Sequence, residues 1–294
     1  MAAPNGVLLV DKPGGITSHD VVARARRALN TRKIGHAGTL DPMATGLLIL
    51  GVGPATRLLT YLVGLDKTYT ATIRLGESTD SDDADGEVTA RVNASGVTDD
   101  AIAAGVAMLT GPIAQVPSRV SAIKVGGRRA YDLAREGAHV ELKARDVVVS
   151  RFDLLASRVQ GRCRDLDVVV DCSSGTYVRA LARDLGAGLG VGAHLTALRR
   201  TRIGGFRVDD AASLEGLGDA VLHTPADVAA QIMPAVHADG DQTRDLRHGK
   251  RVVGLGFDGA RAAAIAPDGA LIGIVERRGA EAKSIMNMPE EQHP

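Results

Sequence analysis

The chain has 294 residues, of which 45% are hydrophobic and 24% are charged. This length suits one large domain with a smaller one, and the composition is typical of soluble globular proteins. No stretch of the sequence reaches the roughly eighteen uncharged apolar residues that a membrane-spanning helix needs. The first residues, Met1–Gly6, carry neither a basic start nor an apolar run, so we expect no secretory signal and a cytoplasmic location.

The cysteines predict no metal site. Cys163 and Cys172 are the only two, they form no CxxC pair, and no clustered histidines accompany them. We therefore expect reduced, buried thiols and no structural zinc.

The charges are unevenly distributed, although the formal net charge is zero. Acids dominate from Glu77 to Asp100, whereas bases dominate from Arg119 to Arg151 and again from Arg199 to Arg207. Segregation of this kind predicts a basic face that suits a nucleic acid. Ordinary solvated faces explain the charge pattern equally well when it is taken alone.

The first predicted elements alternate between strand and helix. Val7–Val10 is an apolar run that ends in a turn and predicts a strand. Ser18 then has the character of an N-cap for a helix whose apolar face includes Val21 and whose polar side carries arginines. Leu47–Val52 predicts a buried strand, and Arg57–Val63 a short helix.

Strands and helices continue to alternate in the middle of the chain. Thr68–Leu75 is rich in β-formers and predicts a strand, which a polar, acidic loop over Gly76–Asp85 follows. Thr98 is the expected cap of a helix that runs through Leu109. The remaining predictions for this part are helices at Ala130–Glu136 and Thr176–Leu185 and strand cores at Val147–Val149 and Leu166–Val170.

The character of the chain changes near residue 230. A helix begins near Thr224 and ends by Met233, and Ala262–Ala266 with Ala270–Val275 then reads as a hairpin. We expect disorder from Met286 onward. The irregular mixture of elements favours an α+β fold over a doubly wound parallel sheet, with domains at 1–230 and 231–294.

Asp41 is the first candidate for chemistry. It lies between Leu40 and Pro42 in a turn just before the predicted buried strand, and Pro42 biases it toward an extended backbone. A carboxylate held at the mouth of a strand can act as a nucleophile or a general base. Aspartate is also a common turn residue that caps its own backbone, and the local pattern alone favours that simpler interpretation.

Two tyrosines and an arginine are further candidates. Tyr69 stands at a strand start and Tyr177 at a helix entry, and the ring of each can stack on an unpaired base. A core tyrosine with one hydrogen bond is the alternative for both. Arg179 can pair with a carboxylate and lower its pKa, although most helix arginines are merely solvated.

Other familiar motifs are absent or fail. The acidic segment around Asp83 hints at a calcium loop, but counting from Gly86 puts Ser81 and Val92 where acidic ligands are needed. The glycines at 188–192 lack the strand and helix of a dinucleotide site. The sequence has no phosphate-binding GxxxxGK[ST] loop and no serine nucleophile elbow.

Six segments together resemble the bacterial tRNA pseudouridine-55 synthases. They occur in the order typical of that family and span nearly the whole first 205 residues. The segments are Asp11–Ser18, His36–Gly46, Lys67–Tyr69, Ser121–Tyr131, Ser174–Arg179 and Leu198–Arg200. Chance is a poor explanation for six such motifs in order.

The resemblance implies a fold and an activity. The fold is a central mixed, largely antiparallel sheet flanked by helices and loops, with an RNA-gripping insertion at about 112–145 and a small β-rich, PUA-like RNA-binding domain at the C-terminus. The activity is isomerisation of uridine 55 in the T arm of tRNA, with no metal or cofactor. The implied enzyme is a cytoplasmic monomer that needs no membrane and no protein partner.

The resemblance also implies roles for individual residues. Asp41 is the catalytic carboxylate, either as a nucleophile or as a base, and Arg179 pairs with it. The target base is flipped out of its stack, Tyr69 stacks on it, and His36 fills the space that it leaves. The remaining implied binding residues are Tyr177 and Leu198, which line the pocket, and Lys12 and Lys67, which support it.

Two segments depart from the family pattern. Gln115–Ser121 replaces the usual Pro-Pro and aromatic run, which puts the contacts of the insertion in doubt, and Leu246–Val252 fits the C-terminal pattern only loosely. Two further hypotheses stay open at this point. One is a tRNA-folding chaperone that needs no chemistry, and the other is a subunit that takes its target from a guide RNA.

Overall fold

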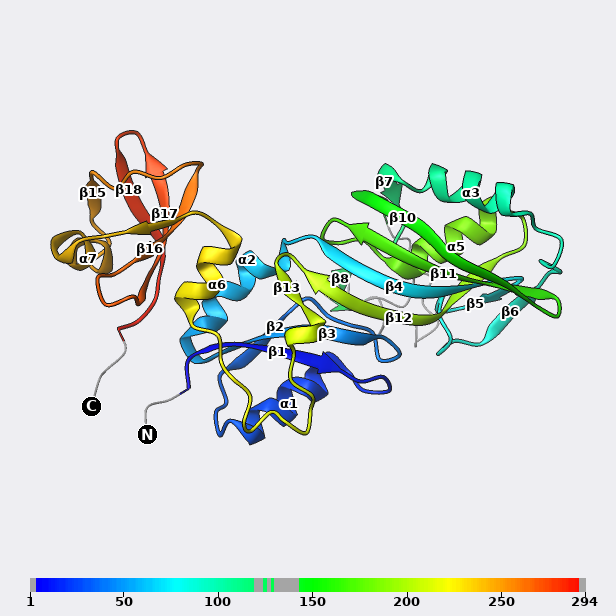
Figure 1. The fold of residues 1–294 in the computed structure, drawn as a ribbon, viewed down its shortest axis with the longest axis horizontal. Helices are drawn as coiled ribbons and strands as arrows, with labels where there is room; N and C mark the ends of the chain where they lie inside the picture. The colour runs from blue at the N-terminus through cyan, green and yellow to red at the C-terminus, as the bar shows by residue number, and fades with distance from the viewer. Residues whose placement is uncertain (1–3, 119–123, 126–127, 130–142, 291–294) are drawn as a thin grey trace.

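The computed structural model describes residues 4–118, 124–125, 128–129 and 143–290. Within these ranges a large mixed sheet and a smaller five-stranded sheet dominate the molecule (Figure 1). The smaller sheet forms a separate lobe built from the C-terminal residues. This architecture confirms the predicted α+β class with a β-rich C-terminal part.

The large sheet has the strand order β1-β3-β12-β4-β11-β10-β7, with β2 paired to β3 and β13 paired to β12. All its pairings are antiparallel except the short one between β3 and β12. The strands are β1 Gly6–Lys12, β2 Ile34–Ala37, β3 Thr45–Val52, β4 Lys67–Leu75, β7 Gly111–Gln115, β10 Arg145–Gln160, β11 Cys163–Cys172, β12 Ala193–Ile203 and β13 Phe206–Arg207.

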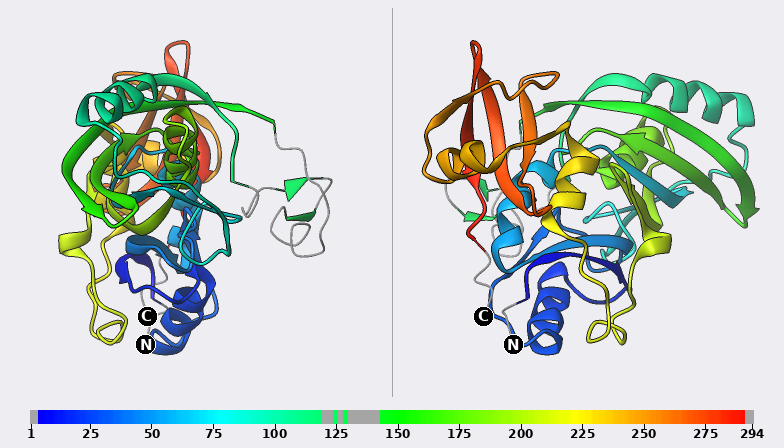
Figure 2. Two further views of the ribbon diagram at one scale, coloured as in Figure 1. Left: turned by 90° about the vertical axis from the view of Figure 1, so that its right-hand side faces the viewer. Right: turned by 60° about the vertical axis from the view of Figure 1, so that its left-hand side comes forward.

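Helices cover both ends of this sheet. α3 and α5 pack on β4, β10 and β12, and the core between them includes Leu40, Tyr69 and Leu198. α1 packs on one face of the β1–β3 pair, whereas α2 and α6 pack on the other (Figure 2). The helices are α1 Ser18–Ala28, η1 Gly53–Leu58, α2 Leu59–Val63, α3 Asp99–Met108, α5 Val178–Gly188, η2 Val208–Asp210 and α6 Pro225–Ile232.

The smaller sheet has the order β14-β16-β17-β18-β15, and α7 packs against it. One apolar cluster joins it to the large sheet, because Ile265 and Ile274 pack with Leu9 and Ile49. Its elements are β14 Ala235–His237, α7 Gly240–Arg247, β15 Arg251–Val253, β16 Arg261–Ile265, β17 Leu271–Arg278 and β18 Glu281–Asn287. Two hairpins complete the described strands, β5 Glu77–Thr79 with β6 Val88–Arg91, and β8 Lys124–Val125 with β9 Arg128–Arg129.

Burial follows the alternation of side chains along β1 and β3. Val7, Leu9, Leu47 and Ile49 belong to the cluster that holds α2 and α6, whereas the residues between them belong to the cluster under α1. Because successive side chains of a strand point to opposite faces, continuous apolar runs are what a strand covered on both faces requires. This confirms the buried strand that the sequence predicts at Leu47–Val52.

Several local predictions need correction. The N-cap of α1 is Thr17, in a capping box with Asp20, so Ser18 is the first helical residue. The expected helix at 57–63 is a 3-10 turn followed by the short α2, and the acidic loop begins with β5. The segment from Met286 is ordered as far as residue 290, because β18 continues to Asn287 and Met288 is buried. The expected helix at 130–136 lies outside the described residues.

The junction of β3 and β12 depends on a glycine. Gly46 pairs with Arg200 at a φ of +101°, and a Cβ atom there would lie 2.2 Å from the Arg200 carbonyl oxygen. We expect Gly46→Ala to lower the free energy of unfolding by about 3 kcal/mol or more, because it adds both strain and overlap. Urea unfolding measures this loss.

Gly64→Ala is the matched control for Gly46→Ala. Gly64 caps α2 at a φ of −74°, and a Cβ atom there meets nothing within 4 Å. It should leave the stability unchanged or raise it by up to about 1 kcal/mol. Equal losses in the two variants would contradict the argument from close approach.

Candidate active site

The backbone around Asp41 is fixed from both sides. Asp41 lies in the loop between β2 and β3, and the Ser18 hydroxyl bonds to both the amide (2.9 Å) and the carbonyl (3.1 Å) of Leu40. On the other side, the carbonyl of Pro42 accepts hydrogen bonds from Gly15 N at 2.9 Å and from Lys12 Nζ at 3.2 Å. α1 and the end of β1 therefore hold the carboxylate in place.

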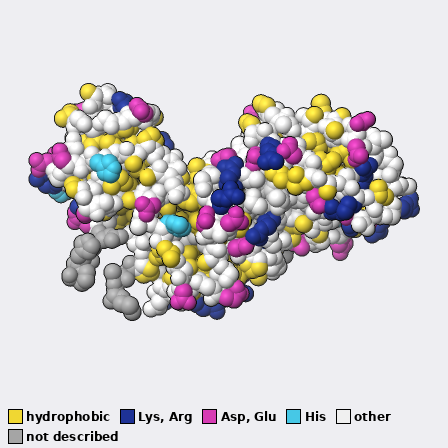
Figure 3. Space-filling view, viewed as in Figure 1, with side chains coloured by type: hydrophobic (Ala, Val, Ile, Leu, Met, Phe, Trp, Pro, Cys, Tyr) yellow, Lys and Arg dark blue, Asp and Glu magenta, His cyan; other side chains and the backbone are white. Residues whose placement is uncertain are grey.

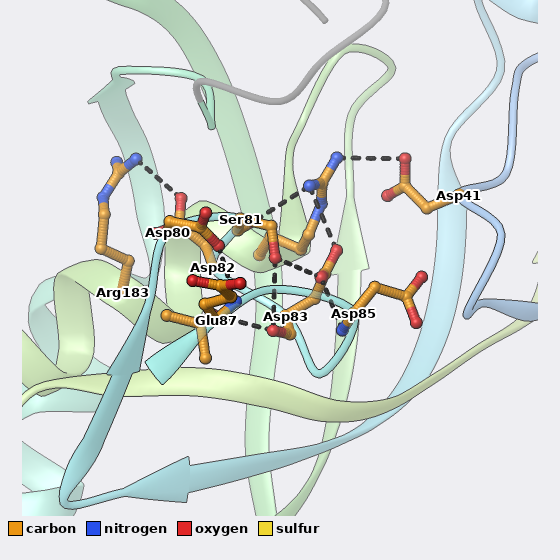
Figure 4. Close-up of polar contacts among 10 residues, drawn as sticks. Asp41, Asp80, Ser81, Asp82, Asp83, Asp85, Glu87 and Arg183 are labelled. Atoms are coloured by element: carbon orange, nitrogen blue, oxygen red, sulfur yellow. Dashed lines mark hydrogen bonds and ion pairs between the residues drawn. The ribbon is translucent and has the colours of Figure 1, made fainter. Parts of the chain in front are cut away.

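Arg179 joins Asp41 to a second carboxylate. Its side chain is 4% exposed, and its Nη2 lies 3.0 Å from Asp41 Oδ1. Its Nη1 lies 3.2 Å from Asp83 Oδ2 and donates to the Ser81 carbonyl at 2.9 Å. Asp41 and Asp83, both labelled in Figure 4, reach this guanidinium from different loops. The first turn of α5 thus brings together residues that are far apart in the sequence.

Opposing influences act on the ionisation of Asp41. Its pKa is raised above the ordinary carboxyl value chiefly by burial, and the Asp83 charge acts in the same direction, whereas Arg179 lowers it. Its side chain nevertheless remains 35% exposed, while Asp83 is 5% exposed. Of the three linked residues Asp41, Arg179 and Asp83, Asp41 is therefore the one that a ligand can reach.

The acidic loop is held rigidly under Arg179. Asp83 Oδ1 accepts from the Ser81 hydroxyl at 2.5 Å and from the Asp85 amide at 3.1 Å. Asp82 adopts a φ of +62° and pairs with Arg183 at 3.3 Å. Arg183 also donates to the Val116 carbonyl at 2.7 Å, so α5 ties this loop to the residues after β7.

Two buried lysines bind backbone carbonyls. Lys12 Nζ donates to Ile16 O at 2.7 Å and to Pro13 O at 2.9 Å, in addition to Pro42 O. Lys67 Nζ donates to the carbonyls of Val63 (2.6 Å) and Leu65 at the end of α2. Burial lowers the pKa of each amine from 10.5 to about 8.

The lowered lysine pKa values predict a stability that increases in mild alkali. Between pH 8 and 9 the folded chain loses these protons while the unfolded chain keeps them, so the free energy of unfolding rises with pH. We expect a gain of about 1 kcal/mol per lysine over this interval. Urea unfolding at the two pH values measures the gain, and Lys12→Met should remove about half of it. An unchanged slope in this variant would contradict the assignment to Lys12.

Tyr69 and Leu198 lie in the core beside Asp41. Tyr69 is on β4 with 8% of its surface exposed, and Leu198 is on the neighbouring β12 with 7% exposed. Both belong to the apolar cluster that contains Leu40. Burial raises the pKa of the Tyr69 hydroxyl, and the Asp41 charge raises it further. The ring therefore lies within electrostatic reach of the carboxylate.

Tyr177 is fixed at the N-cap of α5 by a glutamine. The side chain of Gln115, which is 2% exposed, accepts from Tyr177 N at 2.8 Å and donates to Tyr177 O at 3.1 Å. This two-point contact sets the start of the helix two residues before Arg179. The end of β7 thus positions both Tyr177 and the arginine.

His36 lies on β2 and meets α1. Its ring packs edge-to-face on His19, with centroids 5.4 Å apart. Burial lowers its pKa, and the charges of His19 and Arg200 act in the same direction. Among the described residues, no group makes a hydrogen bond to its buried Nδ1.

The structure brings some of the predicted residues together and leaves others apart. The ion pair joins Arg179 to Asp41, Lys12 reaches the same loop, and Tyr69 and Leu198 pack beside it. The other three make contacts elsewhere: His36 packs on His19, Lys67 bonds to the backbone at the end of α2, and Tyr177 bonds to Gln115. The described residues also contain no group of three or more His, Cys, Asp or Glu side chains that could hold a metal ion.

Sequence reasoning missed three residues that build the site. Asp83 lies in the rejected calcium loop and Gln115 in the segment that departs from the family pattern, and neither has a predicted role. Arg200 has no predicted role, yet it is buried and donates to the carbonyls of Leu47 (2.8 Å) and Gly38 (3.1 Å). The one signal in the sequence that could have pointed to Asp83 is the Ser81–Asp83 run. It contains two adjacent acids, whereas a single aspartate is enough to stabilise a turn.

The arginine run at 199–207 does not supply the free basic face that the charge pattern predicted. Arg199 pairs with Asp11 at 2.7 Å and Arg202 with Asp66 at 2.8 Å, while Arg200 is buried. Arg207 lies 3.5 Å from Asp209. In the view of Figure 3, several groups of Lys and Arg side chains likewise lie next to Asp and Glu side chains. Most of the run from Arg119 to Arg151 lies outside the described residues.

Three family models together match most of the chain. Residues 26–178 match the TruB family pseudouridylate synthase (N terminal domain). Residues 179–238 match the tRNA pseudouridylate synthase B C-terminal domain, and residues 233–289 match the tRNA Pseudouridine synthase II, C terminal. The chain belongs to the TruB family of pseudouridylate synthases. It is accordingly an enzyme that forms pseudouridine from uridine, which confirms the resemblance found in the sequence.

Individual relatives support membership of the TruB family. A tRNA pseudouridine synthase B from Leifsonia xyli subsp. xyli is 54% identical and covers 98% of each chain. One from Nocardia farcinica is 57% identical and covers 95% of this chain and 92% of its own. The solved archaeal box H/ACA sRNP Nop10-Cbf5 complex aligns at a TM-score of 0.72 with 25% identity, over 99% of this chain and 88% of that one.

No helix among the described residues is long and apolar enough to cross a bilayer.

Proposed function

We propose that this TruB-family enzyme converts uridine 55 in the T arm of tRNA to pseudouridine, with Asp41 as its catalytic carboxylate. The observation that carries the assignment is the partly exposed Asp41 held by the buried Arg179. The relatives reported above are named tRNA pseudouridine synthase B, which supports tRNA as the substrate. Position 55 rests on the resemblance of the motifs around Asp41.

The reaction exchanges one bond of the nucleotide for another. The bond between C1′ of the ribose and N1 of uracil breaks, the base turns, and C1′ bonds to C5, which gives up its proton to N1 or to solvent. No oxidation state changes, so the isomerisation calls for no redox cofactor. Asp41 acts either as the nucleophile that holds the separated fragment or as the base that starts the cleavage.

The surrounding residues support a flipped base. Tyr69 and Leu198 offer an aromatic ring and an aliphatic side chain beside Asp41, and a ring that stacks on a base contributes about 1–3 kcal/mol. This contribution offsets a large part of the few kcal/mol that flipping costs. We assign Tyr177 to the rim of the same pocket and His36 to the gap in the RNA stack. Lys12 and Lys67 hold the backbone around the site.

Further properties belong to the same proposal. The enzyme works in the cytoplasm, where its tRNA substrate is made, as a monomer without an obligatory protein partner. We place the catalytic domain at 1–230, with the RNA-gripping insertion at about 112–145. The C-terminal unit at 231–294 is a PUA-like RNA-binding domain, which its compact five-stranded sheet supports.

Mapping pseudouridine in a bare tRNA transcript tests this proposal. The purified chain should modify uridine 55 with no other protein or RNA present, and a transcript with cytidine at position 55 should remain unmodified. Modification at another uridine would overturn the assigned position. A requirement for a second RNA would favour a guide-dependent subunit, and binding without modification would favour a chaperone alone.

A further inference from the structure

One region of the surface carries cations without partners. Between Thr17 and Leu40 the sequence contains five lysines and arginines and a single acid, Asp20. All five cations are exposed, and the side chains of four of them form no ion pair or hydrogen bond within the part of the chain that the structure describes. These four are Arg24 and Arg27 on α1 and Arg32 and Lys33 in the turn that follows. We call these four residues the α1 cation patch.

The α1 cation patch differs from the other arginine groups. Exposed arginines such as Arg91, Arg207 and Arg244 each pair with an acid within 3.5 Å. Charges that are already paired have little to gain from a phosphate, because binding must first break the existing pair. The unpaired cations on and after α1 carry no such cost. The patch is therefore better suited to a polyanion than the arginine run at 199–207.

The α1 cation patch is connected to the candidate active site. α1 begins at Ser18, whose hydroxyl holds Leu40 next to Asp41, and His19 packs on His36. Helix geometry places Arg24 about 9 Å along the axis from Ser18, with Arg27 on the same face one turn further. Arg24 and Arg27 thus extend the positive charge along α1, away from the pocket, over a distance longer than one nucleotide.

Neighbouring groups leave the patch basic. Asp20 is engaged by the amide and hydroxyl of Thr17 and also interacts with the charge of Arg24, while the fifth cation, Arg26, donates to the Ile34 carbonyl. One acid thus faces four cations. The segment packed beside α1 carries exposed acids at Glu215 and Asp219, and neither forms an ion pair with the patch among the described residues. The field of the patch is therefore not cancelled by its surroundings.

The burial of α1 argues against a membrane as the partner. A helix that lies on a bilayer must offer its apolar face to the lipid. The apolar face of α1 consists of Val21, Val22 and Ala25, all of which are at most 4% exposed beneath the helix. Only the basic face is available, and it suits a phosphate backbone.

We propose that the α1 cation patch binds the phosphate backbone of the RNA stem that adjoins the flipped nucleotide. Arg24 and Arg27 contact phosphates nearest the pocket, and Arg32 and Lys33 contact phosphates further along the same arm. The contacts orient the arm without reading its sequence. The proposal rests on the proposed function for the identity of the RNA.

The salt dependence of tRNA binding tests the α1 cation patch. The dissociation constant of an unmodified tRNA transcript is measured from 50 to 200 mM KCl for the wild type and for Arg24→Gln/Arg27→Gln/Arg32→Gln. Each lost contact should reduce the slope of log affinity against log salt by about 0.9, so we expect a decrease of about 2 to 3. Arg24→Lys/Arg27→Lys/Arg32→Lys keeps the charges and should keep the slope.

The matched control is Arg91→Gln/Arg158→Gln/Arg207→Gln, which removes the same charge from arginines that are already paired. It should keep the wild-type slope. Equal slopes for the wild type and the α1 glutamine variant would overturn the proposal, and so would an equal decrease in the control. The salt slopes measure binding and do not depend on turnover. An Asp41 variant that remained active would refute the catalytic assignment, but it would leave the test of the α1 cation patch unaffected.

Discussion

Asp41→Asn should abolish pseudouridine formation, with a loss of turnover of roughly ten-thousand-fold or more. The substitution keeps the size of the side chain and an oxygen that can still accept from Arg179 Nη2, so the loop and the ion-pair partner stay in place. What disappears is the negative charge that we propose as the nucleophile or base. Single-turnover assays with saturating enzyme separate this chemical defect from a binding defect.

The binding of tRNA supplies the second half of this test. Because most of the affinity should come from phosphate contacts, Asp41→Asn should bind tRNA within a few-fold of the wild type. Asp209→Asn is the control, since it removes an exposed carboxylate that meets Arg207 at the surface, and it should keep full activity. Normal modification by Asp41→Asn would show that another group performs the chemistry.

The sequence predicted individual strands and helices correctly where the spacing of apolar residues follows a single pattern. The run at 47–52 is apolar throughout because β3 is covered on both faces, and the hairpin of β16 and β17 has a turn with Gly269 at positive φ. Helix ends were also predictable where a side chain caps the backbone, as Thr98 does for α3. Local signals such as these do not depend on distant residues.

The site was less predictable, because its contacts join distant segments. Nothing near Asp83 in the sequence indicates that it shares Arg179 with Asp41, since that contact depends on how α5 packs beside the β5–β6 hairpin. The roles of Gln115 and Ser18 have the same origin, because each side chain bonds to a backbone far along the chain. Ser18 also has the side chain of an N-cap, which Thr17 supplies instead.

The charge pattern predicted a free basic face at 199–207, and this prediction failed for a related reason. A run of arginines in the sequence says nothing about which acids the fold places beside them. The pairing of Arg199 with Asp11 and of Arg202 with Asp66 spans more than a hundred residues. By contrast, α1 carries a single acid, Asp20, and none of its arginines forms an ion pair with another segment among the residues that the structure describes.

Arg179→Gln should reduce turnover by about a hundred-fold or more and destabilise the fold by about 3–5 kcal/mol, because it leaves buried Asp83 without its ion-pair partner. Arg179→Lys keeps the charge but cannot reach both carboxylates and the Ser81 carbonyl with one planar group, so it should recover only part of the activity. Activity and urea unfolding of the two variants measure these losses together.

The pH profile distinguishes an effect on Asp41 from a general loss of structure. In the proposed mechanism, activity rises as Asp41 ionises. The charge of Arg179 lowers the pKa of this carboxyl, and that of Asp83 raises it. The acid limb of kcat/KM should therefore move to higher pH in Arg179→Gln and to lower pH in Asp83→Asn. If Arg179 and Asp83 had only structural roles, both variants would lose rate, and the acid limb of kcat/KM would stay at the wild-type pH in each. Shifts in the same direction would refute the view that the two residues act on Asp41 in opposite senses.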